Sequence, residues 1–62
     1  MQFHVENMTC GGCVRRVTKA IQALDSAAHV EAEPATRKVV VESNRPRNEI
    51  EAVLAEAGYP AA

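Results

Sequence analysis

The sequence predicts a small α+β fold in which an antiparallel sheet carries two helices on one face. Apolar and polar residues alternate in three short stretches, which is the pattern of half-buried strands. In two longer stretches, apolar residues recur every three or four positions, which indicates amphipathic helices. The order along the chain is strand, helix, strand, strand, helix, and a short final segment that can add a fourth strand.

The first predicted strand is followed by a loop and then by the first helix. In "QFHVE", residues 2–6, Phe3 and Val5 point to one side and their neighbours to the other. "NMTCGG" reads as a turn-like loop. From Cys13 the period becomes helical, and the helix is expected to end near residues 25–26. Its apolar stripe consists of Val14, Val17, Ala20, Ile21 and Leu24.

Two further strands are predicted to form a β-hairpin. Residues 28–33, "AHVEAE", alternate, and residues 38–42, "KVVVE", are rich in β-branched side chains. Residues 34–37, "PATR", form the tight turn between them. Alternation places Val39 and Val41 on one face and the valine between them on the other, without telling which face meets the core.

The second helix is predicted from Pro46, which suits a first helical turn, with its cap undecided among residues 43–45. Gly58 is expected to end it in a left-handed conformation, and residues 59–62, "YPAA", form at most a short edge strand. The helix stripe consists of Ile50, Val53, Leu54 and Ala57. The complete pattern is a ferredoxin-like βαββαβ sandwich, a single domain over residues 1–62.

Charge and hydropathy narrow the range of partners and locations. The net charge of −1 argues against nucleic acid as a partner. No stretch approaches the ~20 apolar residues of a transmembrane helix, and the first residues do not resemble a signal peptide. We therefore expect a cytoplasmic protein with no membrane insertion. Thiols stay reduced there, so a CxxC pair favours metal binding or redox chemistry over a structural disulfide.

The only two cysteines, Cys10 and Cys13, lie where the first strand gives way to the first helix. Metals bind the thiolate form of cysteine. Cys13 falls in the first helical turn, where free N–H groups and the helix dipole favour negative charge. Nearby Arg15 and Arg16 act in the same direction, and the glycines at positions 11 and 12 leave the two sulfurs free to converge on one ion.

Cu(I), zinc and iron–sulfur sites differ in the number of protein ligands that they need. Soft thiolates bind Cu(I), zinc or iron–sulfur clusters. Structural zinc takes about four ligands, and clusters typically take four cysteines. Two thiolates complete a two-coordinate Cu(I) site, whereas zinc would need borrowed ligands, and neither His4 nor His29 has the short spacing to the cysteines typical of a zinc site. A thiol–disulfide redox protein is the other reading, although a thioredoxin-like CxxC needs a larger scaffold.

At this point the chain resembles the heavy-metal-associated domains, which include bacterial cytosolic copper chaperones. The motif MxCxxC stands here at residues 8–13, and "AEAGYP" matches the family's closing helix, glycine and aromatic residue. The resemblance implies a metallochaperone, not an enzyme, that binds Cu(I) through Cys10 and Cys13. It would pass the ion by thiolate exchange to a copper-transporting P-type ATPase or to the N-terminal metal-binding domain of one.

The resemblance also assigns roles to the neighbours of the cysteines, with Met8 packed inward beneath the loop and Tyr59 close to the metal. Zinc-preferring relatives often carry an acidic residue beside the CxxC, so Thr9 favours copper, although a carrier of zinc, cadmium or mercury stays open. The residues around the site are Met8, Thr9, Gly11, Gly12 and Tyr59.

The three basic residues of the first predicted helix can be interpreted in two ways. Arg15, Arg16 and Lys19 form either a solvated helix face or a patch that docks an acidic partner. The apo protein is expected to be a monomer, and two chains that share copper between their CxxC motifs would make a metal-bridged dimer.

Overall fold

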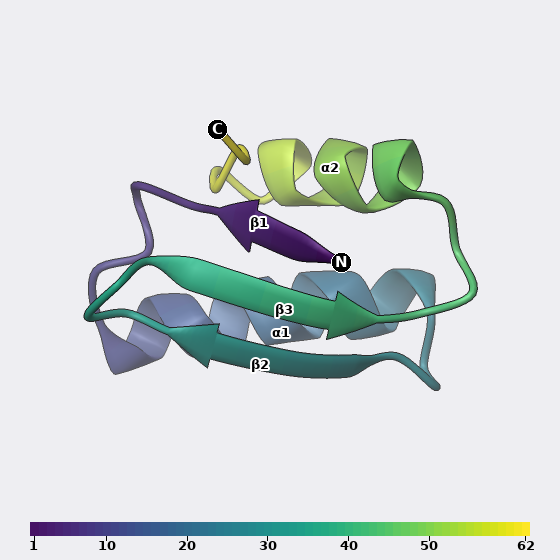
Figure 1. The fold of residues 1–62 in the computed structure, drawn as a ribbon, viewed down its shortest axis with the longest axis horizontal. Helices are drawn as coiled ribbons and strands as arrows, with labels where there is room; N and C mark the ends of the chain where they lie inside the picture. The colour runs from purple at the N-terminus through teal and green to yellow at the C-terminus, as the bar shows by residue number, and fades with distance from the viewer.

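The computed structural model describes residues 1–62 and contains three strands and two helices (Figure 1). The elements are β1 (Gln2–His4), α1 (Gly11–Leu24), β2 (His29–Glu33), β3 (Lys38–Glu42) and α2 (Arg47–Glu56). The strand order is β1-β3-β2, and both pairings are antiparallel. Both helices pack on one face of this sheet, which confirms the predicted α+β, ferredoxin-like arrangement. Neither helix is long and apolar enough to span a membrane.

The core lies between the sheet and the two helices and contains no buried polar or charged residue. Val39 and Val41 of β3 are both 0% exposed, so they face the helices. Val40 therefore lies on the outer face, where its neighbours in register are Gln2 and Glu31. The buried residues are Phe3, Val5, Met8, Val17, Ile21, Ala28, Val39, Val41, Ile50, Leu54 and Tyr59.

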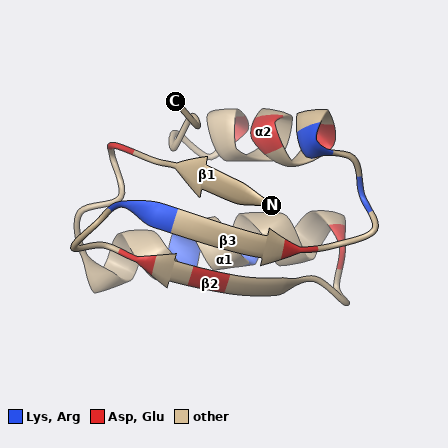
Figure 2. Ribbon diagram, in the orientation of Figure 1, with Lys and Arg blue, Asp and Glu red and all other residues tan.

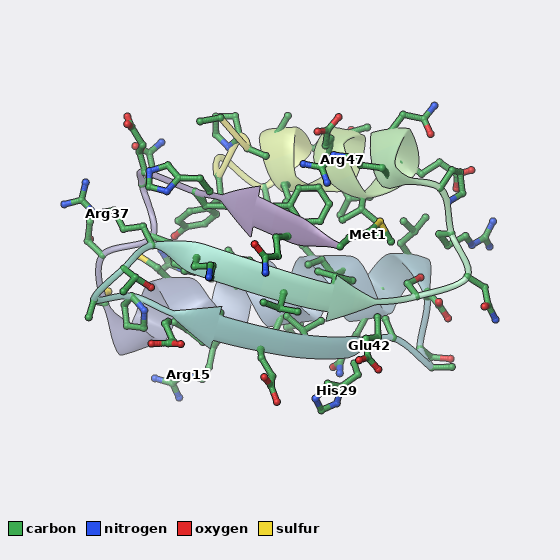
Figure 3. The ribbon with its side chains drawn as sticks, in the orientation of Figure 1. Met1, Arg15, His29, Arg37, Glu42 and Arg47 are labelled. Carbon is green, nitrogen blue, oxygen red and sulfur yellow. The ribbon has the colours of Figure 1, made fainter.

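The turn between β2 and β3 contains a residue in the left-handed region of backbone space. Arg37 has φ 58° although it is not glycine. Its carbonyl oxygen accepts a hydrogen bond of 2.8 Å from the backbone N–H of Val5, which extends the pairing of β1 with β3. Arg37 thus lies at the end of the sheet where β1 leads into the loop before α1 (Figure 3).

The expected fourth strand is not formed. The segment after α2 makes a single backbone hydrogen bond to β1, from the N–H of Ala62 to the carbonyl oxygen of His4 at 2.7 Å. Pro60 has no N–H to donate, which weakens any ladder in this segment. The sheet therefore has three strands, and β1 is an edge strand.

Three helix details differ from the predictions. α1 begins at Gly11, two positions before the expected start at Cys13. Pro46 lies at the N-cap of α2 with ψ 154°, not in its first turn, because its carbonyl oxygen already accepts the N–H groups of the first turn. Ala57 is exposed, because α2 ends at Glu56 and the chain then turns away from the core.

At the end of the molecule opposite the loop before α1, a hydrogen bond joins the side chains of Ser43 and Asp25. The Ser43 hydroxyl donates a hydrogen bond of 2.6 Å to Asp25 Oδ2, and the backbone N–H of Ala27 donates one of 3.1 Å to Asp25 Oδ1. The hydroxyl of Ser43, followed by the N–H of Ala27, lowers the pKa of Asp25. This contact joins the connection after α1 to the connection before α2.

Candidate metal-binding site

The two cysteines meet at the N-terminus of α1. Cys10 is the N-cap residue, with an extended backbone at φ −152° and ψ 172°, and its carbonyl oxygen accepts the N–H of Val14 at 3.1 Å. Cys13 lies in the first helical turn. The two sulfur atoms are 3.4 Å apart, and both thiols are free, with Cys10 exposed and Cys13 half-buried. Two soft donors therefore face the same small volume at the surface.

The environment of Cys13 favours its thiolate. The pKa of Cys13 is lowered from 9.0 to about 6, first by a hydrogen bond with the Tyr59 side chain, then by the backbone at Thr9 and by the thiol of Cys10. The thiolate of Cys13 is therefore favoured at neutral pH. A thiolate is the form that binds metal ions.

Tyr59 reaches Arg16 in the first turns of α1 because α2 ends in a specific C-terminal turn. The N–H of Tyr59 bonds to the carbonyl oxygen of Leu54 at 2.8 Å, and that of Gly58 bonds to Ala55 at 3.1 Å. These two bonds form a Schellman motif, which needs a left-handed residue, and Gly58 supplies it with φ 90°. The ring of Tyr59 is then packed in the core at 7% exposure, while its hydroxyl takes part in the site.

The loop before the cysteines is anchored on both sides. The side chain of Met8 is 0% exposed, and its N–H bonds to the carbonyl oxygen of Val5 at 3.2 Å. Asn7 Nδ2 donates a hydrogen bond of 3.3 Å to the carbonyl oxygen of Gly58. Sequence reasoning missed Asn7, because an asparagine in a loop gives no signal of a partner 51 positions away.

Thr9 lies in the loop before the cysteines, and the two glycines between them begin α1. Thr9 is exposed and faces the site through its backbone. A Cβ on Gly11 would meet no atom within 4 Å, and one on Gly12 would lie 3.8 Å from Cys10 Sγ, an ordinary contact. A Cβ would therefore fit at both positions in the metal-free chain.

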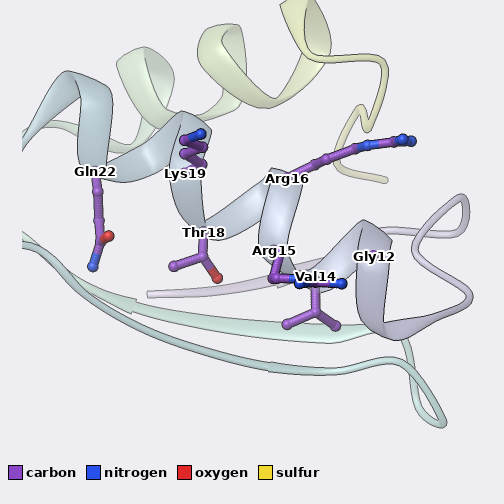
Figure 4. A pocket seen from close by; sticks show the side chains of 7 residues that line it. All are labelled: Gly12, Val14, Arg15, Arg16, Thr18, Lys19 and Gln22. Atoms are coloured by element: carbon purple, nitrogen blue, oxygen red, sulfur yellow. The ribbon is translucent and has the colours of Figure 1, made fainter.

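The three basic residues of α1 line a surface groove beside the cysteines (Figure 4). Figure 2 shows the charged residues along the fold, and α1 itself carries no acidic residue. The groove is lined by Gly12, Val14, Arg15, Arg16, Thr18, Lys19 and Gln22. All three basic side chains belong to exposed residues, so the structure brings the predicted patch together on one helix.

Arg16 differs from the other two basic residues because it contacts Tyr59. Its Nη1 donates a hydrogen bond of 3.4 Å to the Tyr59 hydroxyl, and the side chain extends toward the loop that follows α2 (Figure 4). This hydrogen bond, followed by the charges of Tyr59 and Cys13, raises the pKa of Arg16. Nothing in the sequence indicated this contact, since the two residues are 43 positions apart.

No other metal-binding group accompanies the cysteines. The structure contains no cluster of three or more His, Cys, Asp or Glu side chains that could hold an ion. His4 lies 3.9 Å from Glu6, and His29 lies 3.3 Å from Glu31, so each histidine faces a carboxylate of its own strand or loop. Within one chain, Cys10 and Cys13 thus offer two sulfur donors 3.4 Å apart.

Comparison with solved structures agrees with this fold. Among solved structures, a gold-binding protein is 49% identical, with a TM-score of 0.96 over 98% of this chain and 94% of that one. The copper chaperone Atx1 from Synechocystis PCC6803, in a trimeric form, is 31% identical, with a TM-score of 0.97 over 100% of this chain and 98% of its own. A protein from Agrobacterium tumefaciens is 40% identical, with a TM-score of 0.90 over 97% and 94% of the two chains.

Comparison with curated proteins finds no match. The sequence model of the heavy-metal-associated domain, in contrast, matches residues 2–60, which is nearly the whole chain. This chain therefore belongs to the heavy-metal-associated domain family.

Proposed function

We propose that this protein is a metal carrier, not an enzyme, that binds one Cu(I) ion through the thiolates of Cys10 and Cys13. The observation that carries the proposal is the pair of free sulfurs 3.4 Å apart at a helix N-terminus. Soft thiolate donors select Cu(I), and the chain offers no additional ligand cluster that would complete a zinc site.

Release of the ion is proposed to occur by exchange of thiolates. A sulfur of the partner forms a bond to Cu(I), and the bond to Cys10 or Cys13 then breaks, while copper keeps its oxidation state. The exposure of Cys10 supports this sequence, because an incoming thiolate can approach the ion before a resident one leaves. Two similar sites need little net driving force for the transfer.

The partner we propose is a copper-transporting P-type ATPase or its N-terminal metal-binding domain. The basic side chains of Arg15, Arg16 and Lys19 beside the cysteines support docking of an acidic surface. Reversing the charge of Arg15 and Lys19 should slow transfer to an ATPase domain at low salt and have less effect at high salt. Transfer rates that do not change at low salt would contradict docking through α1.

The metal is tested by titrating the reduced protein with Cu(I) against a chromophoric chelator. We expect one tightly held ion per chain, and loss of binding in the double variant Cys10→Ser, Cys13→Ser with an unchanged circular dichroism spectrum. Failure to compete with the chelator would contradict the carrier. Disulfide-reductase turnover by the reduced protein would instead support the redox alternative.

Au(I) is a second candidate cargo. The 49% identity to a gold-binding protein favours it, and thiolates suit soft metal ions generally. Parallel titrations with Cu(I), Au(I), Zn(II), Cd(II) and Hg(II) in the same buffer rank the metals. A clear preference for Zn(II) or Cd(II) over Cu(I) would overturn the assignment of copper as the cargo.

We place this activity in the cytoplasm, where thiols are kept reduced, and expect the apo protein to be a monomer. Metal can bridge the CxxC pairs of two chains into a dimer. Light scattering after chromatography, with and without one equivalent of Cu(I), measures both states. A dimer that persists without metal would contradict the apo monomer.

A further inference from the structure

The edge strand β1 directs part of its backbone away from the sheet. The α-amino group of Met1 donates to the carbonyl oxygen of Val41 at 2.9 Å, and the N–H of Val41 donates back at 2.8 Å. Val5 bonds at 2.8 Å to the turn before β3. In an antiparallel pair, such bonded positions alternate with positions whose N–H and C=O groups point away from the partner strand. The backbone groups of Gln2 and His4 therefore point to the outer edge.

Only one of these outward groups has a partner within the chain. The carbonyl oxygen of His4 accepts the N–H of Ala62 at 2.7 Å, and this is the one backbone bond between β1 and the segment after α2. The N–H and C=O of Gln2 and the N–H of His4 remain unpaired. Unpaired groups on a strand edge form a template on which another extended segment can pair, and strand addition is a recurring mode of peptide recognition.

A groove runs beside this edge, and its charged lining is basic. Lys38, which takes part in none of the protein's four ion pairs, belongs to the lining together with Arg47 and His4. No acidic residue lines the groove. Charge complementarity therefore favours an acidic segment over a basic or neutral one. The complete lining is Gln2, Phe3, His4, Thr36, Lys38, Arg47 and Ala62.

Arg47 is placed to contact a segment that lies beside β1. Its guanidinium lies over the ring of Phe3, 4.3 Å from the centroid, and its side chain lies between α2 and β1 (Figure 3). Its one hydrogen bond within the protein runs from Nε to Glu51 Oε2 at 3.2 Å. A guanidinium carries further N–H donors on its two Nη atoms, so these are available to a carboxylate in the groove.

We propose that the outer edge of β1 binds an extended, acidic segment of another protein, which adds a strand to the sheet beside Gln2. The backbone of the segment pairs with the free groups of Gln2 and His4. Side chains of a strand alternate between its two faces, so carboxylates meet Arg47 on the helix side and Lys38 on the outer face. This surface does not include the cysteines, so the inference goes beyond the proposed carrier function and does not depend on it.

The first test titrates the metal-free, ¹⁵N-labelled protein with the hexapeptide acetyl-Glu-Val-Glu-Val-Glu-Val-amide. Binding should shift the amide resonances of Gln2 and His4 and slow hydrogen exchange of the Gln2 amide, because this N–H becomes paired. The matched peptide with lysine in place of glutamate has the same strand-forming pattern and the opposite charge. It should bind more weakly than the acidic peptide at low salt.

The backbone part of the proposal is tested with Gln2→Pro. Proline removes the outward N–H, and the bonds from β1 to β3 are made by other residues, so the variant should keep its fold, as circular dichroism can check. Loss of one hydrogen bond should weaken binding of the acidic peptide about two- to tenfold.

The charge part is tested with Arg47→Gln and its matched control Arg45→Gln. Both arginines are exposed, and each pairs with a glutamate four positions later, whereas only Arg47 lines the groove. Arg47→Gln should weaken binding about two- to tenfold at low salt, and the loss should shrink at high salt. Arg45→Gln should bind as the wild type does.

Four outcomes would overturn the proposal. They are unchanged Gln2 and His4 resonances with millimolar acidic peptide, equally tight binding of the lysine peptide, wild-type affinity in a folded Gln2→Pro variant, and equal losses in the two arginine variants. Sedimentation of the metal-free wild type adds a fifth: a dimer that Gln2→Pro dissociates would assign this edge to a second copy of the chain. Because every measurement uses metal-free protein, failure to bind copper would contradict the carrier function alone.

Discussion

The side-chain amide of Asn7 donates a hydrogen bond of 3.3 Å to the carbonyl oxygen of Gly58. This contact joins the loop that precedes the cysteines to the turn that carries Tyr59. Replacing Asn7 with alanine should cost only about 0.5–1.5 kcal/mol of unfolding free energy, because the contact is exposed and uncharged. The emission of Tyr59 should nevertheless change, because its turn loses a tether.

The matched control is Asn48→Ala, at an exposed position of α2. Chemical denaturation and tyrosine emission measure both variants. We expect Asn48→Ala to keep the wild-type emission. Equal emission in the two variants would mean that the Asn7–Gly58 bond does not hold Tyr59 in place.

The low pKa of Cys13 predicts the pH dependence of its reactivity. Alkylation by iodoacetamide, followed by mass spectrometry to separate the two cysteines, should show a midpoint near the pKa of about 6 for Cys13. Tyr59→Phe removes the largest cause of the lowered pKa and should move the midpoint upward. A wild-type midpoint near 9.0 would contradict this account of the site.

The same shift predicts how the stability of the reduced apo protein changes with pH. The folded state holds Cys13 at a pKa of about 6, and the unperturbed value is 9.0. Between these values the unfolded chain binds more protons, so this group adds stability as pH rises from 6 to 9 and loses it as pH falls. Thermal unfolding at several pH values should show this rise in the wild type and a smaller rise in Cys13→Ser.

Met8 is predicted to support the fold and not to bind metal. Its side chain is 0% exposed, so Met8→Ala should destabilise the protein by about 2–5 kcal/mol. Met8→Leu keeps the volume and should cost less than about 1.5 kcal/mol. The leucine variant should bind Cu(I) as the wild type does. A folded Met8→Leu protein with weakened binding would identify the thioether as a ligand.

Replacing Gly58 or Gly11 with alanine should change the stability of the protein in opposite directions. Gly58 has φ 90°, and an L-residue in the left-handed region costs roughly 1–2 kcal/mol, so Gly58→Ala should destabilise. Gly11 has open space around it in the first turn of α1, so Gly11→Ala should stabilise by about 0.4–1 kcal/mol through the unfolded state. Urea denaturation of the two variants measures both changes in unfolding free energy. Changes of the same sign in both variants would refute this account.

The parts of the structure that depend on local pattern could be predicted from the sequence. Alternation located β2 and β3, and helical spacing located α1 and α2 to within a few residues. The place of Cys10 and Cys13 at the N-terminus of α1 followed from the same change of period. The face of β3 that meets the core could not be predicted, because the valines at 39–41 are equally apolar on both sides.

The parts that depend on contacts between distant segments could not be predicted. The bond from Arg16 to Tyr59 requires the end of α2 to pack beside the start of α1. The missing fourth strand depends on how far the segment around Pro60 runs along β1, and the structure gives it one hydrogen bond. Hydrophobic periodicity describes which side of an element is buried, and it carries no information about such pairings.

The burial of Met8 and Tyr59 on either side of the cysteines has a consequence for the energetics of metal capture. Both flanks of the site are fixed by the core, so the backbone around the sulfurs is already ordered before an ion arrives. Binding then needs little loss of conformational entropy, and less of the bond energy is offset by ordering of the chain. For the carrier function proposed above, a preorganised two-sulfur site of this kind would let the protein load and unload metal while it keeps one shape.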